Sequence, residues 1–201
     1  MKRPAYESSL PEGYVQVRHI NAKDVKFGLI FNSIAIATLA VVMLIAAVPL
    51  WLQDGVSYAL GIWESMWLLL AFSAALILYI VLHELVHSAV YKALTHQKLT
   101  FGMSWSCAFC GVPNVYTYRR TALLALVAPL TVFTLILVPL TVVLYAVHPL
   151  YYLASAFILG MHLGGCSGDI YVTWLLLFKY RSPRILMRDT GPEQFIFLPK
   201  D

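Results

Sequence analysis

The amino-acid sequence predicts an all-α polytopic membrane protein with four transmembrane helices. Hydrophobic residues make up 60% of the 201 residues, while Asp, Glu, Lys and Arg together make up 12%, about half the charged fraction of a soluble domain. The mean hydropathy is +0.76. The apolar residues gather in four runs of about 25 residues, each long enough to cross the hydrocarbon core as a helix. These observations exclude an ordinary soluble globular protein.

The four apolar runs divide the chain into segments. They extend over residues 27–51, 66–91, 121–147 and 151–178. Three prolines lie inside them and are tolerated, because neighbouring helices can satisfy the backbone groups that a proline leaves unpaired. We expect three parts: a cytoplasmic N-terminal segment over 1–26, a four-helix transmembrane domain over 27–180 and a cytoplasmic C-terminal tail over 181–201.

The basic residues determine the expected orientation of the helices. All 14 Lys and Arg residues precede the first run, lie between the second and third runs, or follow the fourth. By the positive-inside rule, both termini and the connection between the second and third helices are cytoplasmic, an N-in/C-in topology. We expect a multi-pass protein of the plasma membrane whose basic side contacts anionic lipid rather than nucleic acid.

The connection between the second and third helices departs from the helical pattern. Apolar and polar or small residues alternate over 99–106, and 115–118 reads as a second extended run, with the turn residues of 110–114 between them. This pattern predicts a β-hairpin-like element at the cytoplasmic membrane face; the alternative is an amphipathic loop on the lipid headgroups. Cys107 and Cys110 form a lone C-x-x-C here, which we interpret as structural or redox-neutral rather than as a separate zinc site.

The second apolar run contains two histidines and a glutamate, residues poorly suited to hydrocarbon. His83, Glu84 and His87 form the pattern H-E-x-x-H. Residues four apart project from one face of a helix, so both imidazoles can reach a single metal ion. Glu84 is then placed to act as general base on a water molecule rather than as a ligand. Ionisable groups at membrane depth are costly and usually mark function, which favours a zinc site over a polar patch that only packs helices together.

A catalytic zinc site normally has three protein ligands, and the fourth run offers three candidates for the third ligand: His162, Cys166 and Asp169. We estimate depth at 1.5 Å per residue from the lysine that ends each run. Asp169 then lies about 15 Å inside the cytoplasmic edge, at the level of the histidine pair. Cys166 and His162 lie about 20 and 26 Å inside that edge. Depth therefore favours Asp169.

Small residues surround these candidates. Four of them lie close to Asp169 in the sequence: Gly164, Gly165, Ser167 and Gly168. They predict a close approach of the fourth helix to the second. The glycines can also break the fourth helix and change the depth scale, so His162 and Cys166 stay open as third ligands. Either could also complete a four-ligand structural zinc site in a scaffold protein.

These motifs resemble those of the site-2 protease group of intramembrane zinc metalloproteases. They are more similar still to the small membrane proteins classed as "putative zincin peptidases". The resemblance covers about residues 66–178 and depends on HELVH in one helix, followed by Gly-Asp in a later helix. It implies that His83, His87 and Asp169 bind zinc and that Glu84 activates water.

The resemblance extends to two further features of the chain. Residues 99–118 correspond to the membrane-dipping strands that are thought to hold an extended substrate in that group. "ALVAPLTVF", around Pro129, is similar to the helix start that follows those strands. The chain departs from the group in its Gly168-Asp169-Ile170 order at the third ligand, where Asp-Gly is usual, and in having no PDZ-like insert.

The sequence therefore predicts a zinc-dependent intramembrane endopeptidase. We expect it to hydrolyse peptide bonds of membrane-spanning substrates near the cytoplasmic face, with a membrane protein or peptide as substrate and the lipid bilayer as its surroundings. The alternative is a non-catalytic membrane protein that binds or transports a divalent cation, or an inactive protease-like adaptor. A transporter is expected to show paired broken helices and internal repeats, and no convincing repeat relates the two halves of the sequence.

Overall fold

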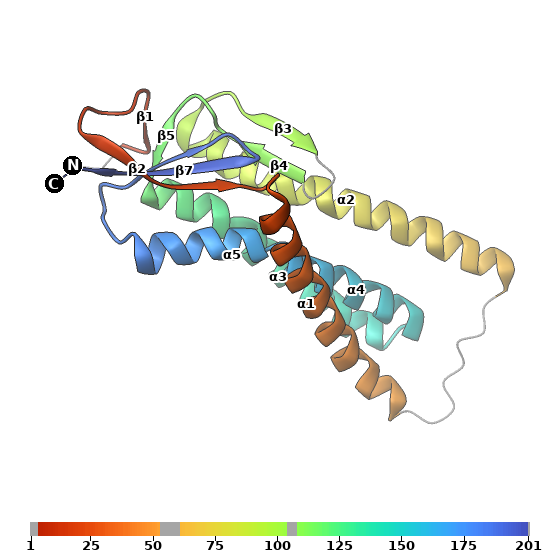
Figure 1. Ribbon diagram of the computed structural model, residues 1–201. Helices are drawn as coiled ribbons and strands as arrows, with labels where there is room; N and C mark the ends of the chain where they lie inside the picture. The colour runs from red at the N-terminus through yellow and green to blue at the C-terminus, as the bar shows by residue number, and fades with distance from the viewer. Residues whose placement is uncertain (1–3, 53–60, 104–107, 201) are drawn as a thin grey trace. The chain divides into compact units, whose positions relative to one another are not determined.

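The computed structural model describes residues 4–52, 61–103 and 108–200. Four helical stretches in this part of the chain are long and apolar enough to cross a membrane, in agreement with the four predicted runs (Figure 1). The helices are α1 (Val25–Trp51), α2 (Ile62–Thr95), α3 (Arg119–Tyr145), α4 (Pro149–Gly165) and α5 (Ser167–Trp174), followed by the π-helical segment η1 (Leu175–Lys179). The fourth stretch comprises α4, α5 and η1, and is broken between Gly165 and Ser167.

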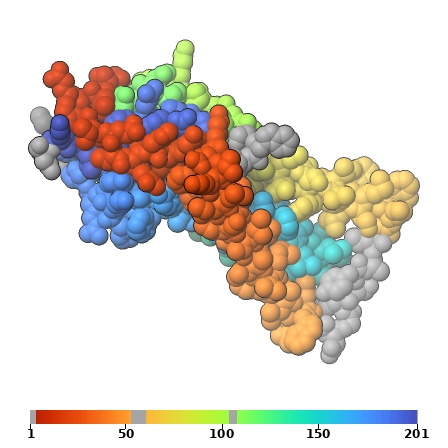
Figure 2. Space-filling model, in the orientation of Figure 1, coloured from red at the N-terminus to blue at the C-terminus, as the bar shows by residue number. Residues whose placement is uncertain are grey.

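The all-α class is too narrow, because the structure contains two β-sheets. The strands are β1 (Tyr6–Glu7), β2 (Tyr14–Asn21), β3 (Thr100–Met103), β4 (Ala108–Gly111), β5 (Tyr116–Tyr118), β6 (Leu186–Asp189) and β7 (Glu193–Pro199). Five of them form an antiparallel sheet in the order β1-β5-β6-β7-β2. Both terminal segments, which gave no strong local signal in the sequence, thus supply four of its five strands. Figure 2 shows the red N-terminal segment beside the blue C-terminal segment, as the pairing of β2 with β7 requires.

The predicted hairpin between the second and third helices exists, but its pairing is different. β3 pairs with β4, from Thr100 opposite Gly111 to Met103 opposite Ala108. β5 instead lies in the five-stranded sheet, between β1 and β6. The prediction that 115–118 returns along 99–106 is therefore wrong, since the terminal strands provide β5 with other partners. Residues 104–107, which include Cys107, lie outside the described residues.

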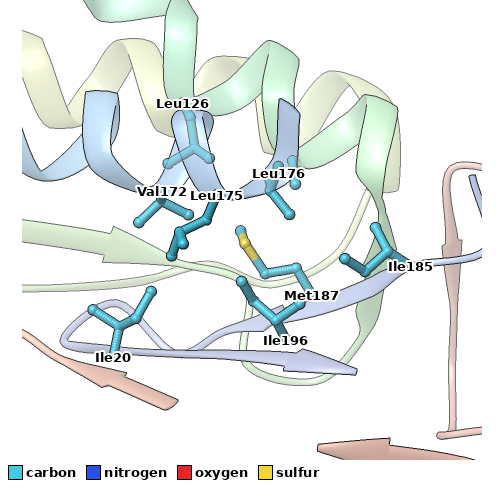
Figure 3. Packing of buried hydrophobic residues seen from close by; sticks show 9 residues of the cluster. Ile20, Leu126, Val172, Leu175, Leu176, Ile185, Met187 and Ile196 are labelled. Carbon is cyan, nitrogen blue, oxygen red and sulfur yellow. The ribbon is translucent and has the colours of Figure 1, made fainter. Parts of the chain in front are cut away.

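The chain forms two compact units. The first comprises residues 1–30, 83–129 and 168–201, and the second comprises 31–82 and 130–167. The first unit contains both sheets, and its main core lies where α3, α5 and η1 cover the five-stranded sheet (Figure 3). Leu126, Val172 and Leu176 pack there against Met187 and Ile196 from the sheet. This packing attaches the terminal strands to the same unit that contains residues 83–87.

A second core of the first unit lies beside the end of α2. Tyr91, Val112, Val115 and Ala125 are all buried and in one cluster. They come from α2, from the connection between β4 and β5, and from α3. The cluster therefore packs the last turns of α2 against both the hairpin region and the first turns of α3.

The second unit is helical, and two glycines determine how its helices pack. A Cβ added to Gly164 would lie 2.7 Å from the backbone of Ala35 on α1, and one added to Gly160 would lie 2.7 Å from the Leu39 side chain. The close approach of Gly160 and Gly164 is therefore to α1, while the predicted approach of the fourth stretch to α2 occurs at Asp169, whose Oδ2 lies 3.3 Å from His87 Nε2. Gly165 and Gly168 meet nothing within 4 Å of an added Cβ, so no close approach depends on them.

Candidate metal centre

One face of α2 carries a stripe of buried polar residues. His83, His87, Tyr91 and Thr95 recur every four residues, and all four are buried. A spacing of four places them one above another on the helix. The neighbouring Leu85 is 46% exposed, as expected of a side chain that faces lipid. The polar stripe therefore faces the protein.

The two histidines of the stripe face an aspartate from α5. His83 Nε2 lies 3.6 Å from Asp169 Oδ2, and His87 Nε2 lies 3.3 Å from the same oxygen. The three side chains are only 10–20% exposed, and their ligand atoms lie within 4.8 Å of one another. Tetrahedral zinc with bonds of about 2.0–2.1 Å separates adjacent ligand atoms by about 3.3 Å. The spacing of these donor atoms fits a single zinc ion.

The hydrogen bonding of His87 supports the same fit. Its Nδ1 lies 2.8 Å from the carbonyl oxygen of Ala125, which can only accept, so Nδ1 carries the proton and donates. In the neutral ring Nε2 then presents a lone pair to the Asp169 carboxylate, and two acceptors at 3.3 Å repel unless a cation or a second proton lies between them. A donor bond from the outer nitrogen to a carbonyl is the usual way of orienting a metal-binding histidine. The donor set therefore has the chemistry of a zinc site.

Glu84 lies beside this group and is held from two sides. The Ser88 hydroxyl donates to the backbone carbonyl of Glu84 at 2.6 Å, and the backbone N–H of Cys110 on β4 is a hydrogen-bond partner of the Glu84 carboxylate. The Cys110 thiol lies 2.9 Å from Ser88 Oγ. Since the Ser88 hydrogen is already donated, the thiol is the donor in that contact. Sequence reasoning did not pair β4 with Glu84.

The other proposed ligands of the fourth run have different surroundings. His162 is fully buried in the second unit, where its Nδ1 lies 3.0 Å from the Tyr79 hydroxyl and its Nε2 lies 3.1 Å from the Thr134 hydroxyl. Cys166 Sγ lies 3.7 Å from His162 Nδ1. Both ring nitrogens of His162 therefore have hydroxyl partners within its own unit.

The sequence profile of one protein family matches this chain. The family is described as "Putative zincin peptidase", and the match covers residues 76–182, just over half of the 201 residues. The chain belongs to this family. The matched segment runs from α2 through η1 and includes His83, Glu84, His87 and Asp169. No curated protein and no solved structure matches the chain significantly.

Membership of the zincin family indicates a zinc-dependent peptidase and supports the predicted cofactor and reaction class. The four long apolar helices indicate a membrane protein.

Proposed function

We propose that this zincin-family chain is a zinc-dependent intramembrane endopeptidase, with His83, His87 and Asp169 as the ligands and Glu84 as the catalytic base. The observation that carries the proposal is the convergence of Nε2 of both histidines on one oxygen of Asp169, at 3.3 and 3.6 Å. Glu84 follows His83 directly on the same helix turn. A zinc ion held there would supply a Lewis acid that polarises the scissile carbonyl and makes a nearby water more acidic.

The residues of the chain have separate roles in this mechanism. Asp169 and the two imidazoles would hold the metal, and the Ala125 carbonyl orients the His87 ring. The Glu84 carboxylate takes the proton of the attacking water and passes it to the leaving amine. The Cys110 N–H on the same carboxylate would restrict its rotation, so that the proton is taken and returned at one place.

The β3–β4 hairpin is proposed as the substrate-binding element. It is a two-stranded sheet, so each strand has an edge outside the pair, and β4 carries Cys110 next to Glu84. A transmembrane helix must unwind before its peptide bond can be cleaved, because helical carbonyls are occupied by hydrogen bonds. An unwound segment can add to a strand edge through main-chain hydrogen bonds.

Cleavage near the cytoplasmic face follows from the charge distribution. Every Lys and Arg residue lies within the residue ranges of the first unit, which also contains the proposed ligands. By the positive-inside rule this end of the helices and both termini would be cytoplasmic. We therefore propose that substrates are cut close to the cytoplasmic ends of their membrane spans.

The proposal is tested with purified protein in liposomes that also contain single-span substrate candidates. Glu84→Gln is expected to lower the cleavage rate by about 10²–10⁴-fold, the usual contribution of a general base, while the bound zinc is retained. Mass spectrometry of the products locates the cut. The matched control is Glu64→Gln, which changes the same residue type on the same helix, at a carboxylate that accepts a hydrogen bond from the Gly61 N–H just before the helix begins.

The outcomes separate the proposed function from its rivals. Equal cleavage by Glu84→Gln and wild type would refute the catalytic role of Glu84. Zinc binding without cleavage of any candidate, together with zinc flux into the liposomes, would instead support the transporter.

A further inference from the structure

A buried carboxylate from the C-terminal tail lies in the first unit but outside the proposed metal centre. Asp189, the last residue of β6, is 3% exposed. Its Oδ2 accepts a hydrogen bond of 2.9 Å from the Tyr91 hydroxyl, and its Oδ1 accepts one of 2.9 Å from the Gly191 N–H. Gln194 approaches Oδ2 at 3.4 Å. Gly191 has φ +100°, so the turn that holds the carboxylate needs a glycine at this position.

The partner of Asp189 belongs to the metal-binding helix. Tyr91 follows His87 by one turn on the buried stripe of α2 and is 1% exposed. It packs in one cluster with Ala125, the residue whose carbonyl accepts the hydrogen bond from His87 Nδ1. The hydroxyl of Tyr91 thus links the ligand-bearing face of α2 to β6, close to the point where α3 orients a ligand.

The main chain of Asp189 reaches the other side of the site. Its carbonyl oxygen accepts a 2.8 Å hydrogen bond from the Val112 N–H, two residues after Cys110, whose N–H contacts Glu84. The contact is close, since a Cβ added to Gly111 would overlap the backbone of Gly191. One residue of the tail is therefore hydrogen-bonded both to the helix with the ligands and to the residue that directly follows β4.

We propose that Asp189 is a positioning residue, which aligns the metal-binding face of α2 with strand β4 through Tyr91 and Val112. This inference depends on the proposed function of the same site. It assigns the C-terminal strands to the catalytic machinery, although they follow the last membrane helix and lie outside the segment that matches the family. The effect of Asp189 on chemistry is indirect, since its hydrogen bonds reach the site through Tyr91 and Val112.

The test measures metal binding as well as cleavage, with the full-length protein in detergent at pH 7.5. Burial raises the pKa of Asp189 to about 6, so the carboxylate is ionised at this pH. Tyr91→Phe and Asp189→Ala are expected to weaken zinc binding, measured by competition with a chelating dye, but by less than the about 10–100-fold that loss of a direct partner of a ligand costs, because both act through α2. Asp189→Asn should lose less than Asp189→Ala, because the amide oxygen still accepts one hydrogen bond.

Two further readouts separate positioning from general stability. With Co²⁺ in place of zinc, the visible absorption bands of Tyr91→Phe should shift, since they report ligand geometry, and kcat should fall more than KM rises. The matched control is Tyr14→Phe, which removes a 2.8 Å tyrosine hydrogen bond to the Arg184 carbonyl in the same C-terminal segment but away from α2. Its zinc affinity and spectrum should equal those of wild type.

The proposal is overturned if Tyr91→Phe, folded as judged by its thermal unfolding, has the zinc affinity, the cobalt spectrum and the kcat of wild type. Tyr91→Phe decides the question even if Asp189→Ala fails to fold. If wild type cleaves nothing, the proposed function fails, but the zinc affinities and cobalt spectra still decide whether Asp189 positions the site.

Discussion

The two units of the chain satisfy their buried polar groups in different ways. All 14 Lys and Arg residues fall in the ranges of the first unit and none in 31–82 or 130–167. In the first unit, buried polar groups connect different elements, as Tyr91 does with Asp189 and His87 with Ala125. In the second, hydroxyls donate to carbonyls of their own helices, as those of Thr141 and Ser155 do, or meet His162 from neighbouring helices. Both units thus join elements through polar contacts, but among the described residues only the first does so with a buried carboxylate, Asp189.

The buried histidines of the two units also differ in the groups that their ring nitrogens meet. His83 and His87 direct Nε2 at one carboxylate oxygen, so donor atoms converge. His162 is also buried, but hydroxyls of Tyr79 and Thr134 meet both of its ring nitrogens. Burial of an ionisable residue in a membrane helix therefore does not by itself identify a metal site. A metal site also needs donor atoms from different elements that converge on one point, as those of His83, His87 and Asp169 do.

The largest effect is expected from removing the converging donors. Purified His83→Ala, His87→Ala and Asp169→Ala should lose bound zinc, with affinities reduced by more than the about 10–100-fold that an outer partner costs. His162→Ala should keep its zinc, because the His162 nitrogens are occupied by hydroxyls. Elemental analysis of the four proteins, after equal dialysis against a weak chelator, measures the difference.

Zinc loss in the His162 or Cys166 variants, rather than in the Asp169 variant, would contradict the proposed ligand set. If Asp169→Ala keeps its zinc while His162→Ala or Cys166→Ala loses it, the third ligand comes from the second unit and the proposed ligand set is wrong. Equal zinc content in all variants would show that none of these residues is needed to bind zinc, and would refute the proposed metal centre.

The sequence predicted the parts of the structure that repeat locally. Runs of apolar residues predicted four helices within a few residues of their ends, and the four-residue spacing placed His83 and His87 on one helix face. Depth along the helices also selected Asp169, which the structure brings to 3.3 Å from His87. Each of these inferences needs only the period or the rise of a helix.

The contacts missing from the sequence prediction join distant segments. β2 pairs with β7 from Tyr14 opposite Pro199, and Asp189 meets Tyr91 across 98 positions. The two terminal segments contain short extended runs among polar residues. Alternation of apolar and polar side chains can indicate a strand, but it does not indicate which strand it pairs with. The pairing within the predicted hairpin was wrong for the same reason: 115–118 was recognised as extended, but the neighbours of β5 are β1 and β6.

A smaller effect tests how far water is excluded from the Cys110 thiol on β4, next to Glu84. Burial raises the pKa of the Cys110 thiol to about 11, from 9.0 for an ordinary cysteine. With Cys107 and Cys166 changed to Ser, Cys110 is the only cysteine of the three. Because the thiolate is the reactive form, alkylation at pH 8 should be about a hundredfold slower than in the unfolded chain, two tenfold steps for two pH units.

The pH profile separates this effect from simple steric protection. Burial favours the neutral thiol, so the penalty on ionisation, and with it a loss of stability, develops as the pH rises from 9 towards 11. The alkylation rate of the folded protein should keep rising tenfold per pH unit past pH 9, where that of the chain unfolded in denaturant levels off. A folded-state rate that also levels off near pH 9 would show that water reaches the thiol freely.

The smallest effect tests the packing of the second unit with two adjacent glycines. Gly164→Ala places a Cβ 2.7 Å from the α1 backbone at Ala35, and since helix backbones cannot yield as a flexible side chain can, we expect a loss of about 1–3 kcal/mol. Gly165→Ala meets nothing within 4 Å and should gain up to about 1 kcal/mol from its higher helix propensity. Thermal unfolding in detergent compares the two. Equal stability would mean that α1 does not approach α4 closely at Gly164.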